Sequence, residues 1–417
     1  MITDPWIVTL GVFGLLVALG ATSGVINDRL WISEPLACAL AGIALGPLYL
    51  GLLRIDPGAS DADAALLREA ARVTLSIAVT GAAMRLPAYW LRQNWRALAV
   101  ALGPGMLLMA AAGALVGGLL ALPWIACVLI GAAIAPTDPV LSAPILTGQL
   151  ARNAVPDALR HAMTAESGIN DGLALPFVMV PILLLQQAPG AAMQDWLMHV
   201  ILWQVGVAVV VGCATGWLTS KGLEWARRQP NADKASLLTV TIALALTTTA
   251  LVHLLDGGDV LAAFIAGAVL NNSNRRAKVE EYHERFSEAL GRFFDLPIMI
   301  LFGAAIPWSA WAGMGWRGAL FAAGVLLLRR LPAWMALGPL MPWTRRRSDA
   351  AFAGWFGPVG AAALYYAMLI REQTGMPGVW PAISLAVGVS VLAHGVTGTP
   401  FTQALGRRTD PEQGIDK

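Results

Sequence analysis

The sequence has few charged residues and few cysteines for a chain of 417 residues. Charged residues make up 13% of it, whereas a typical soluble domain carries about 25%. Hydrophobic residues make up 57%, and the mean hydropathy is +0.64. We therefore expect an integral membrane protein. The 28 basic and 26 acidic residues nearly balance, so the net charge indicates no nucleic-acid partner, and none is expected.

The scarce reactive residues form no recognisable cofactor or catalytic pattern. Cys38, Cys127 and Cys213 lie in apolar segments without the spacing of a zinc site or a disulfide framework. We interpret all three as small buried hydrophobic residues. The sequence contains no Ser/His or metal-ligand constellation, so neither an enzyme nor a resident cofactor is expected. His253, near a span end, is assigned no role.

Long apolar segments make up most of the sequence. A membrane-spanning helix needs roughly 20 apolar residues, and on this scale we predict an all-α polytopic protein with thirteen spans. The first span begins with an acid and no basic region, so we interpret it as a retained helix and not a signal peptide. The predicted spans are residues 5–23, 34–53, 67–85, 96–121, 123–147, 157–187, 196–219, 235–255, 258–271, 291–307, 317–342, 350–370 and 378–397.

The basic residues of the loops predict an orientation. Loops after odd-numbered spans, together with the C-terminal tail, hold 21 Lys and Arg residues. The opposite side holds five, which are Arg54, Arg68, Arg72, Arg317 and Arg371. Because cytoplasmic loops collect Lys and Arg, we expect the N-terminus outside the cell membrane and the C-terminus in the cytoplasm.

One segment differs from the spans in having dense charges of both signs. Residues 272–291 are predicted to form an amphipathic connector on the cytoplasmic surface. The tail after the last predicted span is too short to form a domain. We therefore interpret residues 1–417 as a single integral membrane transporter, in contact with lipid throughout.

Two acids interrupt the sixth predicted span. In "TAESGINDGLALPF", residues 164–177, helical geometry places Glu166, Ser167, Asn170 and Asp171 on one polar stripe. A carboxylate at membrane depth costs about 2.5 to 3.5 kcal/mol and usually marks an ion or proton pathway. The stripe therefore predicts a polar partner inside the membrane.

The fifth predicted span supplies such a partner. Its centre reads "GAAIAPTDPVLSAP", where Pro136 and Pro139 flank Thr137 and Asp138. Each proline removes a backbone donor and breaks the helix, and irregular backbone is tolerated at membrane depth only where it lines a cavity or is buried in protein. The freed carbonyls, the Thr137 hydroxyl and the Asp171 carboxylate are hard oxygen donors, so we predict an alkali-cation site.

Two further spans carry unusual residues. The twelfth contains Gly357, Pro358 and Gly360, in the place of the chain's second half that corresponds to the proline break of the fifth span. Two such interrupted spans in matching positions are typical of inverted repeats. The eleventh contains Arg329 and Arg330 within an apolar run. We expect one of these arginines to be buried against an acid from another span, with Glu166 the best candidate, and do not expect both to be buried.

The motifs together resemble the monovalent cation/proton antiporter superfamily, in particular the NhaP-like sodium/proton exchangers and the fungal plasma-membrane sodium/proton antiporters. The similarity covers almost the whole chain in order. It runs through "ISEPLACALAGIALGP", "APTDPVLSAPILTGQ", "LRHAMTAESGINDGLALPF", "DVLAAFIAGAVLNN", "RRLPAW", "GWFGPVGA" and "VLAHGVTGTP".

The resemblance implies an NhaA/NhaP-like antiporter fold of thirteen helices in which the two broken helices cross. It implies a homodimer, with core helices at approximately 67–187 and 291–397 and the remaining helices forming the dimer scaffold. Asp171 is implied to bind cation and proton in turn, with coordinating residues nearby and other residues organising the site. The implied coordinating residues are Thr137, Ser167 and Glu166, and the organising ones are Asn170, Asp138 and either Arg330, which the alignment favours, or Arg329.

One position departs from the family pattern. Many bacterial members carry a basic residue where this chain has Val359, so charge compensation at the second break is expected to differ here. The Asn170–Asp171 pair is associated in the family with electroneutral one-for-one exchange. We expect that stoichiometry and a role in pH homeostasis.

The expected mechanism is competition between a proton and Na+, Li+ or K+ for Asp171 in a site that opens to one side at a time. The sequence leaves the choice of cation open. Two alternatives also stay open, a cation channel and an ion-coupled organic-anion symporter on a related inverted-repeat fold. A channel would conduct sodium without counter-moving protons, and a symporter would need a recognition group for its substrate.

Overall fold

The computed structural model describes only part of the chain. Within that part every regular element is a helix, which confirms the all-α prediction there. The first predicted span, apart from residue 14, and nearly all of the predicted 272–291 connector lie outside the described residues. The described residues are 14, 33–139, 141–226, 228–229, 237–273 and 296–409.

The helices of the first half follow the predicted spans closely. A π-helical turn, Ala101–Gly105, joins α4 to α5, so that these run as one long helix. Helix α9 has almost the bounds predicted for the sixth span, 157–187. The helices are α2 (Glu34–Leu45), α3 (Asp61–Met84), α4 (Ala88–Val100), α5 (Met106–Gly117), α6 (Trp124–Ile134), α7 (Ala143–Leu146), α8 (Gly148–Ala154) and α9 (Asp157–Gln186).

The second half contains the remaining described helices. A π-helical segment, Trp196–Val205, joins α10 to α11. A helical stretch at 296–304 precedes α15. The others are α10 (Pro189–Asp195), α11 (Gly206–Ala226), α12 (Leu237–Leu254), α13 (Asp259–Ser273), α15 (Trp308–Leu328), α16 (Leu331–Leu337), α17 (Arg347–Trp355), α18 (Ala361–Thr374) and α19 (Val379–Thr409).

Five helical stretches in the described ranges are long and apolar enough to cross a membrane. Four shorter apolar helices accompany them, so the count of thirteen spans stays a prediction. Helix ends follow local chemistry, as where the Ser60 hydroxyl accepts a hydrogen bond from the Asp63 amide at the start of α3. The five stretches are Ala88–Leu120, Asp157–Gln186, Pro189–Ala226, Trp308–Leu340 and Val379–Arg407.

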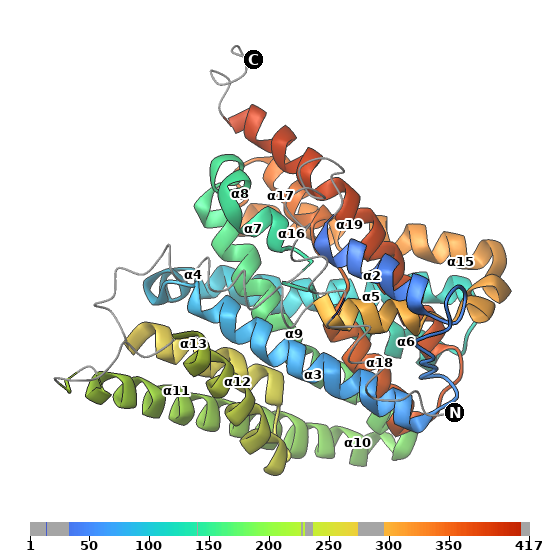
Figure 1. Ribbon diagram of the computed structural model, residues 1–417, viewed down its shortest axis with the longest axis horizontal. Coiled ribbons are helices and arrows are strands. Elements are labelled where there is room, and N and C mark those ends of the chain that lie inside the picture. Colours follow the sequence, from blue (N-terminus) through green and yellow to red (C-terminus); the bar gives the residue numbers. More distant parts are fainter. Residues whose placement is uncertain are drawn as a thin grey trace.

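The helices pack closely through small residues. Figure 1 shows α9 passing through the middle of the molecule, with α3 beside it and α11, α12 and α13 together along one side. A Cβ added to Gly212 or Gly216 of α11 would lie 2.6 or 2.5 Å from a carbonyl oxygen of α13. Small residues at such contacts let helix backbones approach, which is how membrane helices associate when lipid removes the hydrophobic driving force between them.

Helical structure is interrupted at three places that bear on function. The predicted break around Pro136 and Pro139 is confirmed, since α6 ends at Ile134 and α7 begins at Ala143. The predicted break in the twelfth span is confirmed at residues 356–360, between α17 and α18.

The third break corrects a prediction. The eleventh span was expected to be continuous over 317–342, but α15 ends at Leu328 and α16 begins at Leu331. Pro332 lies in the first turn of α16, and a proline there has no N–H to bond the carbonyl four residues earlier. Arg329 and Arg330 therefore lie at a helix break and not within a helix.

The cysteines agree with their interpretation in two cases out of three. Cys38 and Cys127 are buried, whereas Cys213 on α11 is exposed. An apolar segment in a membrane protein can direct a small residue toward lipid as readily as toward the interior, and the sequence pattern does not separate the two.

Candidate ion-binding site

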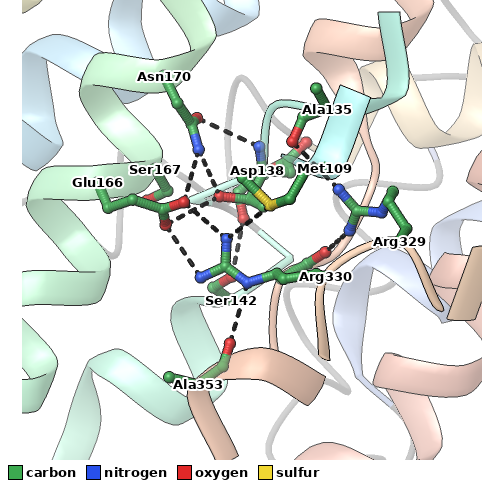
Figure 2. A network of polar contacts seen from close by, with 12 residues as sticks. Met109, Ala135, Asp138, Ser142, Glu166, Ser167, Asn170, Arg329, Arg330 and Ala353 are labelled. Atoms are coloured by element: carbon green, nitrogen blue, oxygen red, sulfur yellow. Dashed lines mark hydrogen bonds and ion pairs between the residues drawn. The ribbon is translucent and has the colours of Figure 1, made fainter. Parts of the chain in front are cut away.

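The polar stripe of α9 lies in the interior, as predicted. Glu166, Ser167, Asn170 and Asp171 are all buried, with Asn170 and Asp171 completely so. Glu166 and Asn170 contact the break between α6 and α7, where Thr137 is also buried. Figure 2 shows Glu166, Ser167 and Asn170 on one helix pointing toward this break.

A hydrogen-bond network joins the stripe to the break. The Asn170 side-chain amide donates to the Thr137 hydroxyl at 2.9 Å and to Glu166 Oε1 at 3.0 Å. Its carbonyl oxygen accepts from the Thr137 backbone amide at 3.2 Å. The Thr137 hydroxyl donates to Glu166 Oε2 at 3.3 Å. Because Asn170 uses both ends of its amide, it fixes the geometry between the two helices.

Glu166 pairs with Arg330, as expected from the sequence. Arg330 Nη1 lies 2.6 Å from Glu166 Oε1, and Nη2 donates to Oε2 at 3.1 Å. Arg330 Nε donates to the Ala353 carbonyl at 3.0 Å, and the guanidinium lies 4.4 Å from the Trp334 ring centre. A paired fork of this kind is the strongest form of arginine–carboxylate contact.

Arg329 corrects the expectation that only one arginine would be buried, because its side chain is buried as well. Its guanidinium donates to the carbonyls of Ile134 and Ala135, at 2.8 and 3.2 Å, and to the carbonyl of Gly357. The first two carbonyls end α6, where the helix dipole places partial negative charge. Backbone carbonyls at two breaks therefore compensate Arg329, and no acid is needed.

Asp138 also connects the two breaks, but with a negative charge at the start of a helix, whereas Arg329 places a positive charge at a helix end. Its Oδ2 accepts from the Ala361 amide at 2.6 Å, at the first residue of α18, where the helix dipole is positive. Its own amide donates to the Pro358 carbonyl at 2.9 Å. Gly360 makes this approach possible, since a Cβ there would overlap the Asp138 carboxylate. Ser142 closes the loop by donating to the Asp138 carbonyl at 2.9 Å.

Asp171 differs from every other acid of the site. Neither of its carboxylate oxygens has a hydrogen-bond partner among the described residues, although both are buried. Its backbone carbonyl accepts from the Tyr366 hydroxyl at 2.5 Å. The Ser167 hydroxyl donates within its own helix, to Thr164 at 3.4 Å. A buried carboxylate without a partner is stable only if it holds a proton or a cation.

Sequence reasoning assigned no role to Tyr366 or to Arg72. The chain has five tyrosines, and Tyr365 and Tyr366 stand together in a predicted span, which is a signal that was available. Arg72 was counted among the five basic residues of the outer side, but it lies within α3 and is buried. Arg72, Ser76 and Thr80 recur at the spacing of one helix face, a second available signal.

The described part of the chain is all helical and buries acids at a helix break, which is an arrangement typical of ion transporters. The family of transmembrane sodium/hydrogen exchangers matches residues 14–404. The chain therefore belongs to this family, and it is an integral, multi-pass membrane protein.

Individual relatives agree with this assignment. A Schizosaccharomyces pombe Na(+)/H(+) antiporter is 30% identical over 89% of this chain and 85% of its own length. The Zygosaccharomyces rouxii Na(+)/H(+) antiporter 2 is 28% identical over 92% of this chain, which spans about half of that longer protein. The structure of the sodium proton antiporter MjNhaP1 from Methanocaldococcus jannaschii at pH 8 matches with a TM-score of 0.71 at 20% identity, covering 95% of this chain and 98% of that one.

Proposed function

We propose that the protein is a secondary active antiporter that exchanges Na+, or another alkali cation, for H+ by alternating access. The observation that carries this proposal is the completely buried Asp171, whose carboxylate oxygens have no partner in the described part of the chain. The relatives named as Na(+)/H(+) antiporters support it.

Charge balance assigns the exchanging role to Asp171. Glu166 is neutralised by Arg330, Arg329 is held by carbonyls at helix ends, and Asp138 compensates the start of α18. Asp171 is then the one acid of the site whose charge must be balanced by a transported ion. A proton or a monovalent cation each does this, and one carboxylate cannot hold both. Exchange on this basis is one for one and electroneutral.

The coordination shell is assigned to oxygens around Asp171. Thr137 and Ser167 offer hydroxyls, and Glu166 offers a second carboxylate, which is paired with Arg330. Hard oxygen donors of this kind suit alkali cations. Asn170, Asp138, Arg329 and Arg330 organise the site, because their contacts hold α9 and the three breaks in one arrangement.

The membrane architecture belongs to the same proposal. The chain is assigned thirteen spans, with the N-terminus outside the cell membrane and the C-terminus in the cytoplasm. The interrupted helices α6–α7 and α17–α18 cross, and the hydrogen bond from Asp138 to Pro358 supports their proximity. The core is assigned to helices within 67–187 and 291–397, and the other helices form the scaffold of a homodimer.

Transport assays in proteoliposomes test the proposal. Each alkali cation is added in turn across a pH series, with and without a clamped membrane potential, while a fluorescent dye reports the internal pH. We expect cation-driven proton flux that does not depend on the clamp, and its loss in Asp171→Asn. Cation-dependent proton flux that persists in Asp171→Asn would refute the assignment of Asp171, and sodium conduction without proton movement would indicate a channel.

A further inference from the structure

A large open cavity lies at the end of the molecule where α3 begins and α18 ends. Its volume is about 1110 Å³, and it is lined by the first turns of α3, the last turns of α18 and the loops beside them. In the proposed orientation these segments face the outside of the cell, so we name this space the outer cavity. Its lining includes Ala64, Ala65 and Arg68 of α3 and Met368, Arg371 and Glu372 of α18.

A buried charged cluster lies one helical turn below the cavity lining. Arg72 follows Arg68 by four residues on α3, and Tyr365 precedes Met368 by three on α18. Arg72 Nε lies 3.0 Å from Asp259 Oδ2, at the start of α13. The Arg72 guanidinium lies 5.5 Å from the centre of the Tyr365 ring.

The cluster has further partners at its rim. Arg72 Nη1 donates to Glu69 Oε2 at 3.0 Å and lies 3.3 Å from His253 Nδ1. Arg72, Asp259 and Tyr365 are all buried. The arginine thus fills the space among α3, α12, α13 and α18 and joins all four helices.

Below the cluster lies the proposed ion site. The rings of Tyr365 and Tyr366 contact each other edge to face, with centres 5.1 Å apart. The Tyr366 hydroxyl bonds the Asp171 carbonyl. Along α3 and α18, Arg72 with Asp259 and Tyr365, followed by the Tyr366 ring, therefore lie between the outer cavity and Asp171.

The helices around the cluster are joined unequally. On one side α3 and α13 are packed backbone to backbone, since Thr80 donates to the Ala263 carbonyl at 3.0 Å and a Cβ on Gly267 would lie 2.6 Å from the Thr80 carbonyl. On the other side ion pairs link α3 to α18 beside the cavity, between Arg68 and Glu372 and between Asp61 and Arg371. Water can replace those partly exposed contacts at little cost.

We propose that Arg72, Asp259 and Tyr365 form a closing layer that separates the outer cavity from Asp171. The layer opens when α18 moves away from the α3–α13 pair, which breaks the contact between Arg72 and Tyr365. Arg72 acts as a positioning residue that closes the site to one side. This inference rests on the proposed alternating-access function, because only such a transporter needs the layer to open and close.

Thiol labelling in intact cells tests the layer without requiring transport. The reporter is Ser76→Cys, one turn below Arg72 and completely buried, in a background where Cys38, Cys127 and Cys213 are alanine. A charged, membrane-impermeant methanethiosulfonate is added outside. We expect slow labelling in the parent and labelling about ten- to hundredfold faster with Arg72→Ala, the factor by which losing a charged hydrogen bond shifts an opening equilibrium.

Two more variants and one reference position complete the test. Tyr365→Ala removes the other half of the contact and should accelerate labelling in the same way. Arg68→Ala removes an arginine one turn further out and should leave the rate unchanged. Ala65→Cys, exposed in the outer cavity, should react quickly in every background and so reports that the reagent reaches the outer cavity.

The outcome is independent of the exchange assay. Labelling of Ser76→Cys that is equally slow in Arg72→Ala and Tyr365→Ala would overturn the closing layer, even if Asp171→Asn abolishes exchange as proposed. Labelling in the parent as fast as at Ala65→Cys would also overturn it. Accelerated labelling in both variants supports the layer whether or not sodium proves to be the transported ion.

Discussion

Two buried arginine–carboxylate pairs, Glu166–Arg330 and Arg72–Asp259, are built in different ways. Arg330 holds both oxygens of Glu166, which also accept from Asn170 and Thr137, and both side chains are at most 3% exposed. The other pair makes a single close contact, with side chains 11% and 9% exposed.

The backbone around each pair explains this difference. Arg330 lies at a break between helices, and its Nε donates to the Ala353 carbonyl at the end of α17. Arg72 lies inside the continuous helix α3, whose own hydrogen bonds satisfy its backbone. The first pair therefore stabilises irregular backbone and must stay in place. The second pair joins complete helices, which can separate without exposing unpaired backbone groups.

The largest expected effect is that of breaking the fixed pair. Glu166→Gln leaves the Arg330 charge buried without compensation, so we expect a loss of about 3 to 5 kcal/mol of stability. Thermal unfolding of the purified protein in detergent measures it. The control is Glu166→Gln combined with Arg330→Met, which removes both charges and should restore most of the loss. A single variant as stable as the parent would contradict the account of this pair.

Breaking the second pair should have a smaller effect. Asp259→Asn leaves Arg72 in contact with Glu69, so we expect a loss of about 1.5 to 3 kcal/mol in the same unfolding assay. If Asp259→Asn destabilised the protein more than Glu166→Gln, the distinction between a fixed pair and a separable one would fail.

The sequence predicted the buried polar stripe of α9 better than the cluster around Arg72, for a physical reason. The α9 stripe could be recognised because helical periodicity and the cost of burying acids are local properties. The two proline and glycine breaks and the pairing of Glu166 with an arginine of the eleventh span followed from the same reasoning, whereas the choice of Arg330 came from the family resemblance. The confirmed bounds of α9, predicted as 157–187 and found at Asp157–Gln186, reflect its long apolar run.

What escaped prediction depends on tertiary contacts. The two arginines were not expected to be buried together, but Arg329 is buried against backbone carbonyls of α6 and Gly357, which no sequence pattern reveals. Arg72 was counted only among the basic residues of the outer side, although it falls within the predicted span 67–85 and lies inside α3. Its partner Asp259 is 187 positions away, and only the fold brings them together.

A substitution at the contact between α9 and α13 should destabilise the protein less than breaking either arginine–carboxylate pair. A Cβ on Gly172, next to Asp171, would lie 2.7 Å from the Leu261 backbone. Gly172→Ala should therefore cost about 1 to 3 kcal/mol and slow exchange by forcing α9 away from α13.

A matched glycine provides the control. Gly222 lies on α11, where an added Cβ would meet nothing within 4 Å. Gly222→Ala should leave exchange unchanged and stabilise the helix by about 0.5 to 1 kcal/mol. Equal exchange rates in Gly172→Ala and the parent would show that the close contact of α9 with α13 does not matter for transport.

If a proton and a cation compete for one carboxylate, the apparent KM for sodium must depend on pH. Initial rates of sodium-driven proton flux are measured in proteoliposomes over a pH series with the membrane potential clamped. Competition at Asp171 predicts an apparent KM that rises on acidification, approaching about tenfold per pH unit, with an unchanged maximal rate. An apparent KM that stays constant while the maximal rate falls would contradict the account, because proton and cation would then bind at separate sites.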